Sequence, residues 1–146
     1  MDTPLHPALV HFPIALISSA FFFQVLYLWK LPLIGRTMSM WLLGLGALLS
    51  LPATISGQGD AVYAVQSGLE TIVLETIQRH ELMANFTTWG SLIVVITWVY
   101  LFLNNPQDKS IDRLALAFLG LLTGLVLFTG YLGGVLSFGY GVGMAG

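Results

Sequence analysis

Residues 114–136 have the sequence LALAFLGLLTGLVLFTGYLGGVL, which contains no charged residue. A helix that crosses a bilayer needs about 20 mostly apolar residues, so this stretch is long enough to span. Three further segments meet the same requirement, at about 11–29, 38–55 and 82–103. We therefore predict an all-α chain that forms one integral membrane domain over 1–146, a polytopic four-helix bundle.

The overall composition agrees with this fold class. The chain of 146 residues is 56% hydrophobic and only 8% charged, and its mean hydropathy is +0.85, which is typical of a polytopic membrane protein. The net charge of −2 without a basic cluster argues against nucleic-acid binding. The lack of cysteine excludes disulfides, iron–sulfur ligation, covalent haem attachment and thiol nucleophiles.

The basic residues predict the orientation of the bundle. Four of the five Lys and Arg residues lie in the loops after the first and third spans, namely Lys30, Arg36, Lys109 and Arg113. The opposite side carries Arg79 together with the carboxylates of Asp2, Asp60, Glu70, Glu75 and Glu81. By the positive-inside rule both termini and the second loop face outward. In a Gram-negative bacterium this places them on the periplasmic side of the inner membrane.

The second loop is predicted to contain structure of its own. Gly57-Gln58-Gly59-Asp60 is expected to end the second span. Apolar residues then recur at helical spacing between residues 60 and 79, at Val62, Val65, Leu69, Ile72 and Val73. We expect an additional amphipathic helix over 60–79 that lies on the outer membrane surface or covers the end of the bundle.

All three histidines are expected at the outer end. His6 and His11 open the first span and His80 opens the third. His6 and His11 differ by five positions, about 140° on an ideal helix, so they would not face one point without irregular backbone. His11 and His80 come from different helices and can face each other across the core, as a bis-histidine haem b requires. Three further residues are expected to complete this outer region: Asp60, Glu81 and Tyr140.

The opening sequence carries a family resemblance. The stretch His6-Pro7-Ala8-Leu9-Val10-His11-Phe12-Pro13-Ile14 resembles the start of a family of small bacterial predicted membrane proteins, catalogued as a domain of unknown function. That family also has Gly-x-x-Asp after the second span, a histidine at the start of the third, and a glycine-rich close. Gly57 to Asp60, His80 and the tail from Gly133 to Met144 match these features.

The resemblance implies a role for the chain, although the chain departs from the family at one position. Family members resemble companions of cytochrome c and Rieske-type proteins, which favours respiratory or photosynthetic-type electron transfer. The family has a histidine before its closing Gly-Val-Gly, whereas this chain has Tyr140. If that histidine is a ligand elsewhere, the chain has lost it or Tyr140 replaces it as an oxygen ligand.

Three hypotheses follow. The first is a b-type haem protein with His11 and His80 as axial ligands, with His6, Asp60 and Glu81 around them, exchanging electrons with a periplasmic cytochrome or similar protein. In this hypothesis His80→Ala abolishes the haem spectrum and His6→Ala weakens it less. The second is a non-catalytic accessory subunit of a larger membrane complex. The third is a single zinc, copper or iron ion held by His6, His11, His80 and a carboxylate.

Other functions lack support in the sequence. No nucleophile–base arrangement, phosphate loop or metalloprotease motif is evident, so no enzymatic activity of its own is expected. No Asp, Glu, Lys or Arg lies in the middle of a span, which argues against an ion-coupled transporter. The inner end is expected to have no polar set comparable with the outer one.

Overall fold

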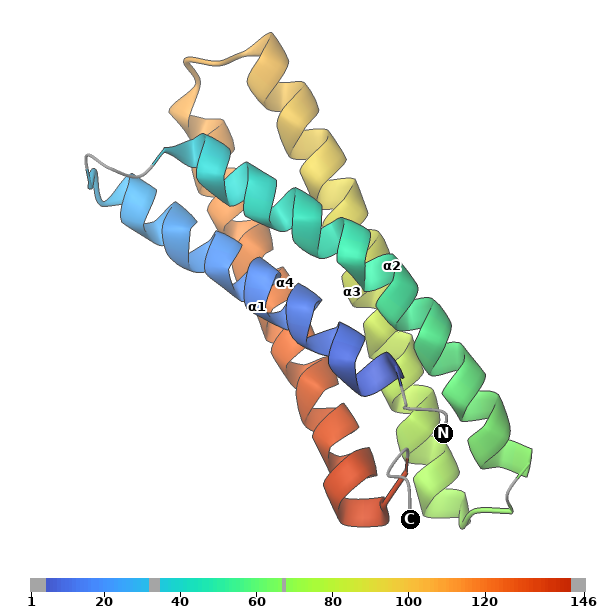
Figure 1. The fold of residues 1–146 in the computed structure, drawn as a ribbon. Helices are drawn as coiled ribbons and strands as arrows, with labels where there is room; N and C mark the ends of the chain where they lie inside the picture. The colour runs from blue at the N-terminus through green and yellow to red at the C-terminus, as the bar shows by residue number, and fades with distance from the viewer. Residues whose placement is uncertain (1–4, 32–34, 67, 143–146) are drawn as a thin grey trace.

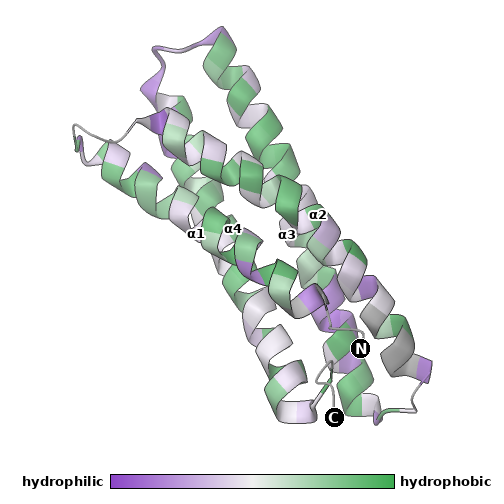
Figure 2. Cartoon of the chain, in the orientation of Figure 1, coloured by the Kyte–Doolittle hydropathy of each residue, from purple (hydrophilic) through white to green (hydrophobic). Residues whose placement is uncertain are grey.

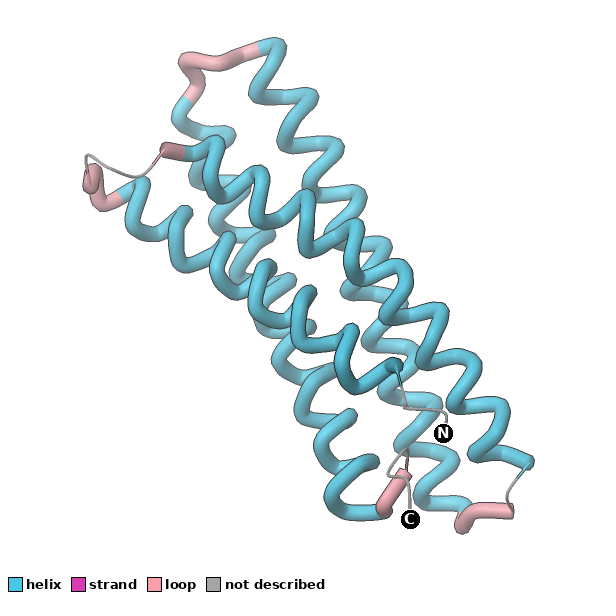
Figure 3. Tube along the Cα trace, in the orientation of Figure 1, coloured by secondary structure: helices cyan, strands magenta, loops and turns pink. Residues whose placement is uncertain are grey.

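Four helices make up the regular structure of the described residues (Figure 1, Figure 3). The computed structural model describes residues 5–31, 35–66 and 68–142, apart from the side chains at 5, 7, 60 and 63–65. The helices are α1 (Leu5–Leu28), α2 (Arg36–Gln66), α3 (Thr71–Asn104) and α4 (Lys109–Gly134), and α4 continues into a short π-helix, η1 (Val135–Gly139). All four are long and apolar enough to cross a membrane, which confirms the predicted fold class.

The helices form one bundle in which α1 and α3 each pack against both α2 and α4. Figure 1 shows the chain termini and the α2–α3 connection at one end, which we call the outer end after the expected orientation. The α1–α2 and α3–α4 connections lie at the other, inner end. Hydrophobic residues dominate the middle of each helix, and hydrophilic positions are more frequent toward the two ends (Figure 2).

The middle of the bundle is closed by apolar side chains. Ile17, Leu43 and Leu119 are completely buried there, and they belong to one core cluster with Ala20 and Leu122. Many large apolar side chains on the outward faces remain exposed, such as Phe22, Trp41, Ile93 and Leu121. A bundle that is apolar on both its inward and outward faces is suited to a lipid environment.

The separate surface helix predicted over 60–79 is not formed. Helix α2 continues through Gly57 to Asp60 and ends at Gln66, and α3 already begins at Thr71. The chain reverses around Gly68, whose φ of 70° is readily adopted only by glycine. Val73 and Ile77 of this segment pack within the bundle in a cluster with Leu136, whereas Val62 and Ile72 are more than half exposed. Their helical spacing therefore reflects two extended bundle helices rather than a helix on the membrane.

Helix α4 begins with a side-chain cap. The carboxylate of Asp108 accepts hydrogen bonds from the backbone N–H of Ser110 at 2.8 Å and from its hydroxyl at 2.6 Å. These bonds satisfy one of the free N–H groups of the first turn. They also lower the pKa of Asp108 below its ordinary value, since both favour the charged carboxylate. The cap fixes Lys109 as the first residue of α4. The start of the helix in turn determines which of the following residues face the core of the bundle.

Candidate functional site

The imidazole of His6 is held by α2. Its Nδ1 atom lies 2.9 Å from the backbone oxygen of Ala53 and 3.1 Å from the hydroxyl oxygen of Ser56. A carbonyl oxygen only accepts hydrogen bonds, so Nδ1 carries the proton and donates it. In the neutral ring this leaves the lone pair on Nε2, which is the state of a histidine that binds a metal through Nε2.

A glycine makes room for this ring. An added Cβ atom at Gly57 would lie 2.7 Å from Cε1 of His6, which is closer than van der Waals contact allows. Gly57 is one helical turn after Ala53, so the carbonyl and the glycine lie on the same face of α2. The ring of His6 thus rests directly on the backbone of α2.

The imidazole of His80 is held in the same way by α4. Its Nδ1 atom donates to the backbone oxygen of Thr129 at 3.0 Å. An added Cβ atom at Gly133, one turn after Thr129, would lie 3.2 Å from Cε1 of His80. The ring is therefore fixed by a carbonyl and a glycine four residues apart, as the ring of His6 is. Its Nε2 atom is again the nitrogen that the carbonyl bond leaves available.

The two imidazoles meet between the helices. Their ring centroids are 6.1 Å apart and their planes are nearly perpendicular, at 86°. The structure thus brings His6 and His80 together, a pair that the sequence alone did not single out. The axial pair of His11 and His80 stays a prediction.

Two cavities adjoin the imidazole pair, and both rings line each of them. The larger has a volume of about 580 Å³ and reaches from the rings toward the middle of the bundle, where Ser50, Thr88 and Val126 line it. The smaller, of about 90 Å³, lies toward the outer end beside Gln58 and Glu81. Both cavities are lined mostly by apolar groups, with Ser50 and Thr88 among the polar residues of the larger and Gln58 and Glu81 among those of the smaller.

The remaining predicted site residues differ in their exposure and in which cavity they line. His11 is exposed and lines the larger cavity, and Glu81 is half-buried and lines the smaller one. Tyr140 is 42% exposed after the π-helix and is not among the residues that line either cavity. Asp60 belongs to α2, but its side chain lies outside the described residues.

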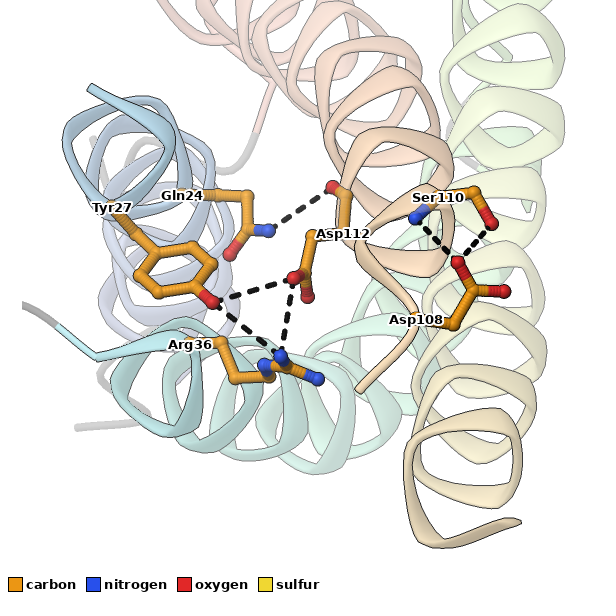
Figure 4. A network of polar contacts seen from close by, with 6 residues as sticks. All are labelled: Gln24, Tyr27, Arg36, Asp108, Ser110 and Asp112. Atoms are coloured by element: carbon orange, nitrogen blue, oxygen red, sulfur yellow. Dashed lines mark hydrogen bonds and ion pairs between the residues drawn. The ribbon is translucent and has the colours of Figure 1, made fainter. Parts of the chain in front are cut away.

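The inner end contains a buried ionic network that the sequence did not predict (Figure 4). The Arg36 guanidinium lies 3.3 Å from Oδ2 of Asp112, and the Tyr27 hydroxyl donates to the same oxygen at 3.3 Å. The Gln24 amide donates to the backbone oxygen of Asp112 at 3.1 Å. The Arg36 guanidinium also lies 4.8 Å above the centre of the Phe102 ring, within the range of a cation–π interaction.

This network is almost completely closed to solvent. The Asp112 side chain is 1% exposed and that of Arg36 is 14% exposed. The expectation that the inner end lacks a comparable polar set is therefore wrong. The sequence predicts that Lys109 and Arg113 lie in a loop, but α4 starts at Lys109 and turns Asp112 toward the core.

Comparison with known proteins identifies a family for the whole chain. The sequence model of one family, described as predicted membrane protein (DUF2231), matches residues 2–146. No curated protein and no solved structure matches the chain.

Proposed function

The chain belongs to the DUF2231 family of predicted membrane proteins, and we propose, from the site described above, that it binds one b-type haem at its outer end. His6 and His80 would be the axial ligands. Such a haem supplies one-electron redox chemistry, which suits a subunit of respiratory or photosynthetic-type electron transfer. The proposed electron partner is a periplasmic cytochrome or similar protein, and the proposed neighbours are other membrane subunits.

The observation that carries this proposal is the distance between the two rings. With metal–nitrogen bonds of about 2 Å, two imidazoles on opposite sides of one metal ion have centroids roughly 6 Å apart. In a tetrahedral site the same bonds bring the centroids to roughly 5 Å. The separation of 6.1 Å between His6 and His80 matches the first value and is also an ordinary distance for an edge-to-face ring contact, so the proposal requires that both Nε2 atoms turn toward one metal ion. The fixed Nδ1–H groups also leave Nε2 of each ring as the ligand atom.

The surrounding space fits an amphipathic cofactor. The larger cavity of about 580 Å³ falls within the range of about 300–1,000 Å³ that is typical of cofactor sites. Its lining is mostly apolar, and Gln58, Glu81 and Asn85 are among the residues that line the outer cavity. An apolar ring system would fit such a lining, and polar substituents on it would find partners beside Gln58, Glu81 and Asn85.

The donor set favours a macrocycle over a single ion. Among the residues that the structure describes, no group of three or more His, Cys, Asp and Glu side chains is placed to hold a metal ion. Structural zinc sites in proteins usually take four protein ligands. A haem requires only two, since the porphyrin supplies four nitrogens. The pair of His6 and His80 is therefore sufficient for a haem.

We propose a bacterial inner membrane location with both termini and the α2–α3 connection outside. The chain has no cysteine, so single cysteines report orientation without background. We expect Gln66→Cys to react with a membrane-impermeant maleimide in intact spheroplasts. Asn105→Cys is expected to react only after the membrane is opened. The reverse pattern would invert the topology and move the site to the cytoplasmic side.

Titration with haem tests the proposed function. Detergent-purified protein prepared without haem is expected to bind haem saturably, at one per chain, and to give a six-coordinate low-spin spectrum. Binding is expected to be stoichiometric at micromolar protein. A titration without saturation, or a high-spin product, would show that the two imidazoles do not act as an axial pair.

A further inference from the structure

We infer that the chain is a repeat of one helical hairpin and that its site has pseudo-two-fold symmetry. Gly57 and Gly133 are equivalent positioning residues, because each leaves room for one imidazole to lie against the helix backbone. We call this placement the seating of the ring. The first hairpin is α1–α2 and the second is α3–α4. The seating of the rings is independent of the ligand. The consequence for the ligand, given below, rests on the proposed function.

The sequence of the two hairpins carries the repeat. Leu43-Gly44-Leu45 stands at the same distance before Gly57 as Leu119-Gly120-Leu121 stands before Gly133. Leu43 and Leu119 are both completely buried. Phe12 and Phe86 likewise follow His6 and His80 by the same number of residues, and each is 56% exposed. At these positions the two hairpins thus share both residue type and burial.

The hydrogen bonds of the two rings follow the same plan. His6 and its carbonyl acceptor are 47 positions apart, and His80 and its acceptor are 49 positions apart. In both hairpins the ring comes from the first helix, and the carbonyl and the glycine come from the second. Each hairpin therefore builds its own seat for an imidazole without help from the other.

Contacts between equivalent positions identify the axis. In a two-fold arrangement, a residue on the axis meets its own counterpart. His6 meets His80 at the outer end. At the inner end Arg36 meets Asp112, and these two residues also stand at equal distances before Gly57 and Gly133. The axis thus runs along the bundle, parallel to the membrane normal, as in other membrane proteins built from parallel repeats.

A site on this axis presents the same donor to both sides of its ligand. Such a site suits a flat ligand whose two faces are equivalent and whose metal accepts one nitrogen from each face. It is less suited to an ion that needs three unlike donors. The ligand class that this symmetry selects is a metal-containing planar macrocycle, in agreement with the proposed function on which this step depends.

The test uses full-length Gly57→Ala and Gly133→Ala, with Gly59→Ala and Gly134→Ala as matched controls. An added Cβ meets nothing within 4 Å at either control position. In ligand-free protein labelled with ¹⁵N-histidine, ring nitrogen shifts report whether Nδ1 carries the proton. We expect Gly57→Ala to release the fixed tautomer of His6, and Gly133→Ala to disturb His80 less because its contact is longer. The melting temperature is expected to stay equal or rise, since alanine favours helix.

The outcomes separate this inference from the proposed function. If Gly57→Ala leaves the ring shifts of His6 unchanged, or if the controls disturb the rings equally, the seating role is wrong. Haem titration of the same variants then tests the ligand. If the rings are held as described but the protein binds no haem, the proposed function and the inference of a planar macrocycle are both wrong. The seating of the rings by the two glycines would still stand.

Discussion

Replacing either His80 or His6 by alanine is expected to abolish the low-spin haem spectrum, whereas replacing His11 is expected to leave it in place. Each of the first two variants removes one of the only two protein ligands of the proposed haem. The loss of affinity is expected to exceed the about 10–100-fold that is typical of losing an outer-shell partner of a metal ligand. His11 lines the larger cavity from an exposed position, so its removal changes the surroundings of the ligand rather than its coordination.

Visible spectra of the three variants, loaded with haem under identical conditions, check this prediction. His11→Ala is the matched control, because it removes an imidazole from the same cavity and the same helix as His6→Ala. The melting temperature of each variant shows whether the fold is intact. If His6→Ala keeps the spectrum and His11→Ala loses it, the axial pair is His11 and His80, as the sequence alone suggested.

Breaking the buried ion pair at the inner end is expected to have the largest effect on stability. Arg36→Ala leaves the Asp112 carboxylate without its counter-charge in a site where it is 1% exposed. Removing one partner of a buried pair costs about 3–5 kcal/mol. Apolar replacement of both partners, as in Arg36→Met with Asp112→Leu, is expected to restore most of that stability because no charge then remains unpaired.

Reversible unfolding in mixed detergent micelles measures these differences. Arg113→Ala is the matched control, since it removes an exposed positive charge from the same end of the bundle and is expected to change stability by less than about 0.5 kcal/mol. If Arg36→Ala is as stable as this control, the ion pair contributes little to the free energy of unfolding. A double variant as unstable as Arg36→Ala would show that packing, rather than charge, is what the site requires.

The four helices could be predicted from the sequence because each contains a long apolar run with polar breaks. The second connection could not be placed, since its helical periodicity is equally compatible with a surface helix and with two extended bundle helices. The decisive feature was the reversal at Gly68, and several glycines in this region were candidates. The packing of Val73 and Ile77 against Leu136 also distinguishes the two arrangements.

The sites were harder to predict because they depend on helix register. The acceptors for both imidazoles are backbone carbonyls, at Ala53 and Thr129, and a carbonyl has no signature in the sequence. Nor does hydropathy reveal that Asp112 turns inward within the first turn of α4. One signal was present: Phe12 and Phe86 follow His6 and His80 by the same number of residues, which pairs those two rings rather than His11 with His80.

A reduced-minus-oxidised visible spectrum of the protein purified from haem-sufficient bacterial membranes tests the central claim most directly. We predict a Soret shift with sharp α and β bands on reduction, and a pyridine haemochrome of the b type at one haem per chain. A flat difference spectrum from folded, full-length protein would contradict the account and leave the imidazole pair of His6 and His80 without a redox role.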